Sequence, residues 1–371
     1  MIRLDHVTKI FGNREKGIVA VDDVSLDLPA GEICVLLGPS GCGKTTTMRM
    51  INRLVQPTSG KIFIDGRDTA GTDPIQLRRS IGYVIQQIGL FPNKTVADNI
   101  CVVPDLLGWD RKKARRRAAE LLELVGMQPA TFMDRYPREL SGGQQQRVGV
   151  IRALAADPPV MLMDEPFGAI DPISREAIQD EFLRMQQTLR KTIIFVSHDI
   201  DEAVKMADKI AIFRGGRLEQ YASPERLLAL PANGFIESFL GSDRALKRLK
   251  LVKVADAMLT GFDVVRGDDP LIHAANLIRA SGLPAAVMVD ANGRPAGLVS
   301  GNASGSKTKV ADHAQPVRAT ALISSDLRNA VALMFASDMP VLPCVDEDGQ
   351  VKGMLTWRSV VKSLSLSEAK P

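Results

Sequence analysis

A glycine-rich segment near the start of the chain limits the possible folds more than any other feature. Residues 31–37 are short and apolar, which is typical of a buried strand, and a helical pattern begins after Gly43. The loop between them runs from Gly38 to Thr45. Its glycines can turn backbone N–H groups and a helix N-terminus towards the oxygens of a phosphate group. The order strand, glycine loop, helix therefore predicts an α/β fold with a phosphate site where the strand ends.

The residue types of this loop match the contacts that a nucleoside triphosphate needs. Lys44 is predicted to reach the β- and γ-phosphates, and the Thr45 hydroxyl is predicted to ligate Mg²⁺. The predicted ATP-binding residues of the loop are Gly38, Pro39, Ser40, Gly41, Cys42, Gly43, Lys44, Thr45 and Thr46. The alternative is a glycine-rich turn that ends in Lys-Thr by chance, and the flanking strand and helix argue against it.

A second apolar segment ends in two carboxylates. Residues 160–165 fit a buried parallel strand whose carboxyl end carries Asp164 and Glu165, at the edge where ligands bind in open α/β sheets. Asp164 is predicted to hold Mg²⁺ through water, and Glu165 to orient and deprotonate the attacking water. Another apolar strand precedes His198, whose imidazole can hydrogen-bond the γ-phosphate. A histidine after a strand is more often structural, so its assignment as catalytic depends on the other motifs.

The pentapeptide Leu-Ser-Gly-Gly-Gln at residues 140–144 lies between these two segments. With this order and spacing, residues 1–240 resemble the nucleotide-binding subunit of an ABC transporter. The resemblance implies that the pentapeptide acts in trans, on the γ-phosphate held by a second ATP-binding subunit. Its acting residues are Ser141, Gly142, Gly143 and Gln144. Because the chain has one phosphate loop and one signature, we expect it to dimerise on ATP, most simply as a homodimer.

Three further positions match motifs of that family. Phe11 is implied to stack on adenine, and a buried core aromatic is the alternative. Gln86 is implied to be catalytic, to sense the γ-phosphate and Mg²⁺, and to contact the membrane partner. Asp171 matches the loop after the carboxylate strand, although the chain has Gly-Ala-Ile-Asp where the family has Ser-Ala-Leu-Asp.

The C-terminal third of the chain contains a repeat. Residues 281–300 recur at residues 337–356 with a constant offset, and each copy predicts a helix, a strand, an Asp-x-x-Gly turn and a second strand. This resembles a pair of CBS domains. We therefore expect a P-loop ABC ATPase domain of α/β class, with a mixed sheet core and a helical subdomain, followed by a smaller α+β CBS pair. The expected boundaries are 1–240 for the ATP-binding domain, 241–252 for a basic linker, 253–310 for the first CBS domain and 311–366 for the second.

The ligand of the repeat is left open by its sequence. CBS pairs often bind adenosyl nucleotides through an Asp three residues after the final Ser or Thr, and these positions are Ala303 and Ser359 here. Ordinary AMP or ATP binding in the tail is therefore not expected, because two acceptors are missing. A cyclic dinucleotide and ionic strength remain the alternative signals.

Two basic segments need an interpretation. Residues 111–117 run into a helical pattern, so a solvated helix start is favoured over a nucleic-acid patch, with proximity to anionic lipid as a third reading. In the linker, five cations could bind the anionic inner leaflet and release it at high salt. These are Arg244, Lys247, Arg248, Lys250 and Lys253. A solvated linker helix explains them equally well.

Composition limits the class of protein. No apolar run approaches the ~20 residues of a transmembrane helix, the N-terminus lacks an apolar signal region, and four cysteines show no framework spacing. We expect a subunit on the cytoplasmic face of the inner membrane, bound to separate permease subunits and working with a substrate-binding protein. A net charge of +4 is too mild to indicate a nucleic-acid partner.

The chain resembles the ATPase subunits of osmoprotectant importers, which take up glycine betaine, choline, carnitine or proline. The resemblance depends on the CBS pair and on two segments, residues 82–92 and 163–172. The alternative is an importer for another small solute, such as an amino acid or a polyamine. A soluble ABC ATPase outside transport would need a long insertion or a second ATPase domain, and the sequence has neither.

Overall fold

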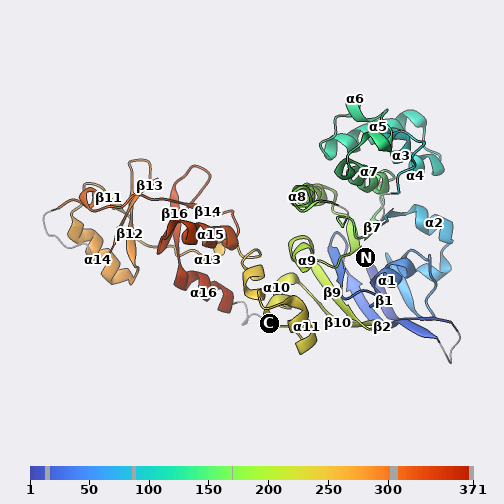
Figure 1. Cartoon of the computed structure of the whole chain (residues 1–371), viewed down its shortest axis with the longest axis horizontal. Coiled ribbons are helices and arrows are strands. Elements are labelled where there is room, and N and C mark those ends of the chain that lie inside the picture. Colours follow the sequence, from blue (N-terminus) through green and yellow to red (C-terminus); the bar gives the residue numbers. More distant parts are fainter. Residues whose placement is uncertain (13–16, 86–88, 169, 301–307, 367–371) are drawn as a thin grey trace. The chain divides into compact units, whose positions relative to one another are not determined.

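The computed structural model describes residues 1–371 except 13–16, 86–88, 169, 301–307 and 367–371. The chain divides into two compact units, whose elements are labelled in Figure 1. The first unit is Met1–Leu227 with Pro231–Ile236, and the second is Leu228–Leu230 with Glu237–Pro371. Helices α10 (Pro224–Ala229) and α11 (Gly234–Leu240) lie where the chain passes between the units.

Among the described residues, the centre of the first unit is a six-stranded sheet. Its order is β10 (Arg217–Ala222), β9 (Lys209–Arg214), β3 (Ile33–Leu37), β8 (Thr192–Val196), β7 (Val160–Asp164) and β6 (Ile81–Val84). The strands from β9 to β6 are parallel, and β10 is antiparallel at one edge. Every residue of β3, β7 and β8 is buried, as expected for central parallel strands covered on both faces. The predicted α/β core is confirmed.

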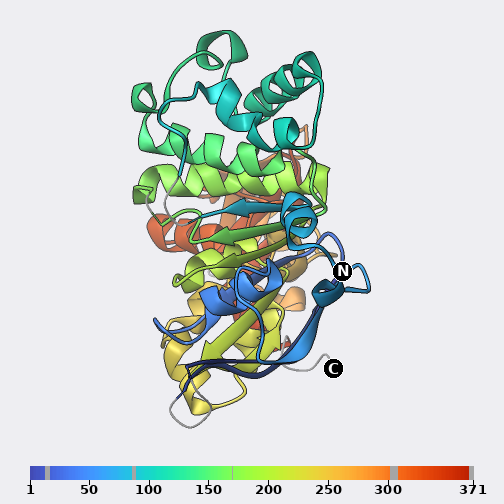
Figure 2. The same cartoon turned by 90° about the vertical axis from the view of Figure 1, so that its right-hand side faces the viewer.

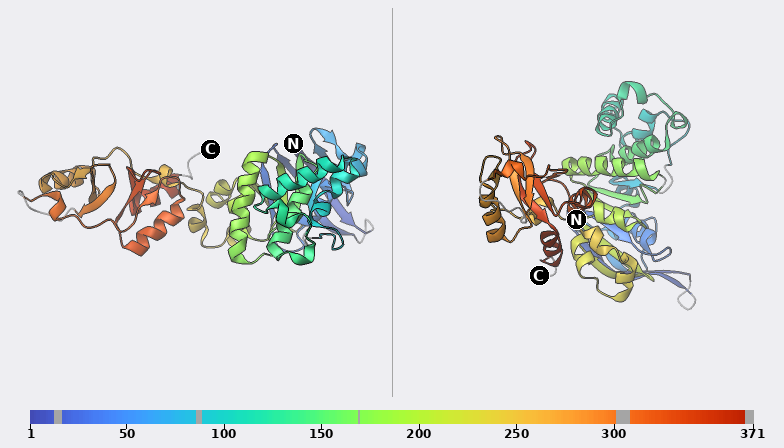
Figure 3. Two further views of the ribbon diagram at one scale, coloured as in Figure 1. Left: turned by 90° about the horizontal axis from the view of Figure 1, so that it is seen from above. Right: turned by 60° about the vertical axis from the view of Figure 1, so that its left-hand side comes forward.

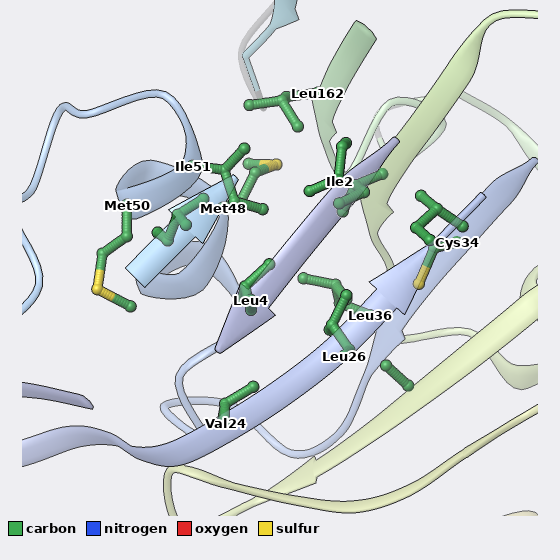
Figure 4. Packing of buried hydrophobic residues seen from close by; sticks show 14 of the residues in the cluster. Ile2, Leu4, Val24, Leu26, Cys34, Leu36, Met48, Met50, Ile51 and Leu162 are labelled. Carbon is green, nitrogen blue, oxygen red and sulfur yellow. The ribbon is translucent and has the colours of Figure 1, made fainter. Parts of the chain in front are cut away.

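A second sheet of the first unit is antiparallel and packs on the phosphate-loop strand and helix. Its order is β2 (Ile18–Leu28), β1 (Ile2–Phe11), β4 (Ser59–Ile64) and β5 (Arg67–Asp68). Figure 4 shows buried side chains of this sheet beside those of β3 and of α1 (Lys44–Ile51). They include Ile2, Leu4, Val24, Leu26, Cys34, Leu36, Met48 and Ile51. This apolar cluster fixes the helix that begins at Lys44 against the strand that ends at Leu37.

The predicted helical subdomain lies between β6 and β7 in the sequence (Figure 2). It consists of α3 (Val96–Ile100), α4 (Val102–Leu106), α5 (Arg111–Leu124), α6 (Pro129–Phe132) and α7 (Gly142–Leu154), with a 3₁₀ turn, η2, at Pro137–Glu139. Helix α5 begins within the basic segment, because Asp110 caps it by accepting from the Lys113 backbone N–H at 3.1 Å. The expected helix start is confirmed there. The other helices of this unit are η1 (Thr69–Gly71), α2 (Pro74–Arg79), α8 (Pro172–Leu189) and α9 (Ile200–Met206).

The second unit contains the expected repeat (Figure 3). Its first copy is β11 (Val265–Arg266), α14 (Leu271–Ser281), β12 (Ala285–Val289) and β13 (Pro295–Ser300), followed by η3 (Val310–Asp312). Its second copy is β14 (Ala321–Leu322), α15 (Leu327–Ser337), β15 (Val341–Val345) and β16 (Val351–Thr356), followed by α16 (Trp357–Leu366). In each copy the first pair of strands is parallel and the second pair antiparallel. The CBS pair predicted from the sequence is confirmed.

Both copies use the same Asp-x-x-Gly turn. The Asp290 carboxylate accepts from the backbone N–H groups of Asn292 and Arg294, at 2.8 and 2.9 Å. Asp346 accepts in the same way at 3.1 and 2.9 Å, two and four residues further on. Gly293 and Gly349 have φ of 77° and 79°, which glycine adopts without strain. The predicted turn is therefore built identically in the two copies.

A short segment before the first copy pairs with the second copy. Helix α13 (Val254–Ala257) begins where the Val254 N–H donates to the Ser325 carbonyl at 2.9 Å. The backbones of Leu259 and Met354 exchange two hydrogen bonds, of 2.8 and 3.1 Å. The expected first CBS domain, residues 253–310, thus starts with residues that pack on the other copy.

The basic linker is partly a buried helix, α12 (Arg244–Arg248). Lys247 and Arg248 are each 8% exposed. Lys247 is paired with Asp243, and the Arg248 guanidinium donates to the Leu364 carbonyl at 2.7 Å. The expectation that all five linker cations face solvent or lipid is therefore wrong for these two, because each is held by a partner within the second unit.

Candidate functional site

The phosphate loop has the backbone shape that requires glycine. Gly38 has φ of 142°, and a Cβ there would lie 2.2 Å from the Phe213 carbonyl oxygen. Gly43, which caps α1, has φ of 105°, and a Cβ there would lie 2.4 Å from the Ala20 carbonyl oxygen. Both positions therefore exclude any side chain, on conformational and steric grounds. The loop is shaped by β2 and β9 as well as by its own sequence.

Lys44 lies inside this loop. Its ammonium donates to the carbonyl oxygens of Gly38 and Pro39, at 2.7 and 2.9 Å, and the residue is 8% exposed. Cys42 is also buried, with its sulfur 3.6 Å from the ammonium. The loop thus holds a positive charge at the helix N-terminus, where anions are attracted.

Thr45 and Asp164 bring two oxygen ligands together. The Thr45 hydroxyl donates to the Asp164 carboxylate at 3.3 Å, although the two residues are 119 positions apart. Asp164 ends β7 and is 6% exposed. Burial raises the pKa of its carboxyl group, and the Thr45 hydrogen bond opposes that rise. A bound dication would favour the ionised carboxylate here.

Glu165 and His198 lie at the same edge of the sheet. Glu165 has φ of 47°, and its backbone N–H donates to the Val196 carbonyl at 3.1 Å. Its carboxylate lies 3.5 Å from Nδ1 of His198, and the two side chains are 25% and 68% exposed. Adjacent parallel strands β7 and β8 therefore bring the acid and the imidazole together in a position that solvent reaches.

The signature pentapeptide forms the start of α7. Ser141 caps the helix by accepting from the Gln144 N–H at 3.3 Å, and the Gln144 side chain accepts from the Ser141 N–H at 3.0 Å. Ser141 and Gly142 are exposed, and Gly143 is half-buried. This helix end thus presents a serine and backbone N–H groups outward. Gln144 has its side chain engaged in the cap.

The residue predicted to stack on adenine is exposed. Phe11 ends β1, is 44% exposed and has the Lys9 ammonium 4.9 Å from its ring centroid, so the alternative of a buried core aromatic is wrong.

The other predicted residues lie as follows. Within the phosphate loop, Pro39, Ser40 and Gly41 are exposed and Thr46 is half-buried. Asp171 is exposed just before α8, where its carbonyl accepts from the Arg175 N–H at 2.9 Å. Gln86 lies outside the described residues.

Sequence reasoning missed a buried carboxylate bonded to the residue before His198. Glu202 is 7% exposed, accepts from the Gln179 amide at 3.0 Å and accepts from the Ser197 hydroxyl. Burial raises the pKa of Glu202, against the effect of these two hydrogen bonds. Ser197 is the residue before His198, so the network supports the turn that carries the imidazole. A polar residue at the fourth position after His198 was the only available signal.

The residues present fit ATP with Mg²⁺. The loop has the backbone shape that only glycine allows at Gly38 and Gly43, its N–H groups can bind phosphate oxygens, and Lys44 supplies a cation beside them. The adjacent Thr45 hydroxyl and Asp164 carboxylate offer the hard oxygen atoms that Mg²⁺ prefers, so Thr45 could bind the ion directly and Asp164 through water.

Comparisons with known proteins agree with this geometry. Residues 21–168 match the ABC transporter family, and residues 254–301 and 315–366 match the CBS domain family. The chain is 51% identical to the osmoprotectant import ATP-binding protein OsmV of Salmonella typhimurium, over 98% of this chain and 96% of that protein. It is 44% identical to the glycine betaine/carnitine/choline transport ATP-binding protein OpuCA of Bacillus subtilis, over 97% and 95%. A dimeric ATP-binding cassette in a post-hydrolysis state, bound to ADP and Pi, superimposes with a TM-score of 0.54 at 35% identity, over 60% of this chain and 99% of that one.

Proposed function

The chain belongs to the family of ABC transporter ATP-binding proteins, and from this we propose that it is the ATP-hydrolysing subunit of an importer for quaternary amine osmoprotectants. The observation that carries the ATPase assignment is the meeting of three elements at one sheet edge. Lys44 and Thr45 come from α1, Asp164 and Glu165 from the end of β7, and His198 from the end of β8. The substrate class is supported by the names of the relatives that match nearly the whole chain.

The proposed mechanism assigns a role to each group. Lys44 and the loop N–H groups neutralise the β- and γ-phosphates, and Thr45 and Asp164 would hold Mg²⁺. When bound, Mg²⁺ supplies charge neutralisation on the phosphate oxygens. Glu165 accepts the proton of the attacking water, and His198 donates a hydrogen bond to the γ-phosphate. Gln86 completes the proposed set as the residue that senses the γ-phosphate, Mg²⁺ and the membrane partner.

We propose that two copies close on ATP. The outward N-terminus of α7, with Ser141, Gly142 and Gly143, would bind the γ-phosphate in the partner's loop. Phe11 would stack on adenine, since its ring is exposed at the end of β1. Asp171 would lie at the dimer interface. The dimeric cassette that resembles part of this chain supports the arrangement.

The other proposed partners are permease subunits and a substrate-binding protein. No helix among the described residues is long and apolar enough to cross a membrane. We place the chain as a peripheral subunit at the cytoplasmic face of the inner membrane, with an ATP-binding domain at 1–240, a linker at 241–252 and CBS domains at 253–310 and 311–366.

The CBS pair would regulate transport without an ordinary adenosyl ligand. Ser359, at the position of the missing acceptor, is 6% exposed and bonded to Thr356, and Ala303 lies outside the described residues. Ionic strength and a cyclic dinucleotide are the remaining signals. Because Lys247 and Arg248 are buried, we propose an anionic-lipid contact only for Arg244, Lys250 and Lys253.

The test is transport by this subunit assembled with its permease and substrate-binding protein in liposomes. ATP-dependent uptake of glycine betaine, competed by choline or carnitine but not by an amino acid or a polyamine, is the expected result. If only the amino acid or the polyamine were taken up, the proposed substrate class would be wrong and the ATPase assignment would stand. Stepping the internal salt, with the tail after residue 241 present or deleted, tests whether the CBS pair senses ionic strength.

A further inference from the structure

Three successive glutamines lie at the start of α7, and each side-chain amide has a different partner. Neighbouring residues on a helix are rotated by about 100°, so their side chains face different directions. Gln144 belongs to the helix cap. The Gln145 amide donates to two carbonyl oxygens just before the helix, at 3.0 and 3.2 Å. The side chain of Gln146 instead bonds outside the helical subdomain, because its amide nitrogen donates to the carbonyl oxygen of Pro166, after β7.

The Gln146 contact is enclosed by protein. Gln146 is 3% exposed, and Pro166 is buried as well. Proline has no N–H, so its carbonyl oxygen is its only backbone hydrogen-bonding group. If the contact breaks, a buried amide and a buried carbonyl are both left unpaired. The hydrogen bond therefore favours one relative position of α7 and the Pro166 segment.

Pro166 directly follows Glu165, whose backbone is held in an unfavourable conformation. Its φ of 47° lies in the left-handed region, which residues other than glycine adopt only under constraint. The Glu165 N–H donates to Val196, and its carbonyl accepts from Gly168, each at 3.1 Å. Gln146 restrains the next carbonyl along the chain, from the side of the signature helix.

From these contacts we propose that Gln146 is a positioning residue, which transmits the position of the signature helix to Glu165 of the same subunit. The proposal rests on the proposed function, because it takes Glu165 as the base and α7 as the helix that closes on the partner's nucleotide. When α7 moves onto that nucleotide, Gln146 draws the Pro166 carbonyl with it and sets the direction of the Glu165 carboxylate. Binding of ATP in the partner's site would thus change the position of Glu165, the base of this subunit.

The decisive variant is Gln146→Leu in the full-length chain, with ATP hydrolysis measured over a range of ATP concentrations. A displacement of about 1 Å in a reacting group can change a rate by ~10²-fold, so we expect kcat to fall about tenfold or more. The KM for ATP is expected to change little, since no nucleotide contact is removed. The Hill coefficient for ATP should fall towards one, because each site no longer reports to the other base.

A second variant separates positioning from mere loss of packing. In Gln146→Glu, the protonated carboxyl can donate to the Pro166 carbonyl, whereas the ionised form can only accept. Burial raises the pKa of such a carboxyl group. The ratio of variant to wild-type kcat should therefore fall as the pH rises, while the ratio for Gln146→Leu stays flat. If Gln146→Leu fails to fold, this pH profile carries the test.

The matched control is Gln145→Leu, on the neighbouring residue whose amide bonds only within the helical subdomain. This variant should lower thermal stability and leave the Hill coefficient unchanged. Its ratio of variant to wild-type kcat should not change with pH. Wild-type kcat and cooperativity in Gln146→Leu, or a flat ratio in Gln146→Glu, would overturn the proposal. Glu165→Gln in the same assay separates the two failures. If it retains turnover, the assignment of Glu165 as the base fails, and this proposal fails with it. If it loses turnover while the Gln146 variants behave like the wild type, only the role of Gln146 fails.

Discussion

The two units of this chain each join a buried strand to a helix, and the two junctions differ. In the first unit, β3 and α1 are separated by the glycine loop, whose backbone excludes side chains at Gly38 and Gly43. In the second unit, α16 follows β16 directly. There the Thr356 N–H donates to the Ser359 hydroxyl and the Ser359 N–H donates to the Thr356 hydroxyl, each at 3.1 Å. The first helix end is open to an anion, whereas the second is closed by its own side chains.

The difference shows what converts a common element into a site. Both helix ends have unpaired N–H groups and a favourable dipole. The first keeps them available because glycine loops carry no capping side chain, and it adds Lys44. In the second, the Thr356 hydroxyl accepts from the Ser359 N–H in the first turn of the helix, and the Ser359 hydroxyl accepts from the residue before the helix. The chemistry of the junction, and not the fold class, therefore decides where nucleotide binds.

The largest expected effect tests the open junction. Glu165→Gln keeps the shape of the side chain and removes the base, so ATP hydrolysis should fall by ~10²–10⁴-fold. ATP binding should survive, and the ATP-bound dimer should accumulate, as measured by light scattering with and without ATP. Unchanged turnover would show that the base is elsewhere.

The next effect tests whether the glycine loop depends on its backbone. Gly38→Ala forces a Cβ against the Phe213 carbonyl, and overpacking of this kind lowers the free energy of unfolding by roughly 1–3 kcal/mol. ATP affinity, measured by calorimetry, should fall as the loop shifts. The control is Gly66→Ala, where φ is also positive, at 73°, but nothing lies within 4 Å of the Cβ. Equal effects in the two variants would show that crowding is unimportant.

A smaller effect is expected at the closed junction. Ser359→Ala removes a cap, which lowers the free energy of unfolding by about 0.5–2 kcal/mol. Trp357 is on the same helix, so its fluorescence in a Trp109→Phe background reports unfolding of the second unit. The KM for ATP should not change. A loss of ATP affinity in Ser359→Ala would mean that this junction also takes part in nucleotide binding.

The smallest effect concerns a third junction, between β8 and α9. Here Asp199 caps the helix while His198 stays exposed, so the junction is partly closed. Burial raises the pKa of Glu202 above its ordinary 4.5, so the folded chain binds this proton more tightly than the unfolded chain does. Stability from this group is present below pH 4.5 and is lost as the pH rises through the raised pKa. The free energy of unfolding of Glu202→Gln, measured by denaturant titration, should not show this loss with rising pH. If the wild type and the variant gave parallel pH profiles, the role of Glu202 would be wrong.

Local patterns in the sequence predicted most of this architecture. Apolar runs predicted β3, β7 and β8 to within a residue or two, and the repeat predicted β12 and β13 with their counterparts β15 and β16. The short strands β11 and β14 lie outside the repeated segments and were not predicted. These features depend on periodicity and turn chemistry, which a single segment carries. The phosphate loop was predictable for the same reason.

Contacts between distant segments were not predictable. The direction of the Gln146 side chain is set by the packing of α7 against the turn after β7, and the left-handed φ of Glu165 is set by hydrogen bonds from β8 and from its own turn. Likewise, Lys247 and Arg248 have the composition of a solvated linker, but both are buried, and Asp243 and the end of α16 give them hydrogen-bonding partners. The residues of the site could therefore be predicted from local motifs, whereas the contacts that hold them depend on tertiary packing.

The pairing of α13 with the second repeat has a consequence for the nascent chain. Leu259 leaves the ribosome well before Met354, the residue with which it exchanges two hydrogen bonds. At about 5–20 residues per second, the segment waits roughly 5–20 s for its partner strand. The α13 segment therefore cannot reach its final pairing until the second copy has been made, and a stop codon between the copies would leave this segment without its partner strand.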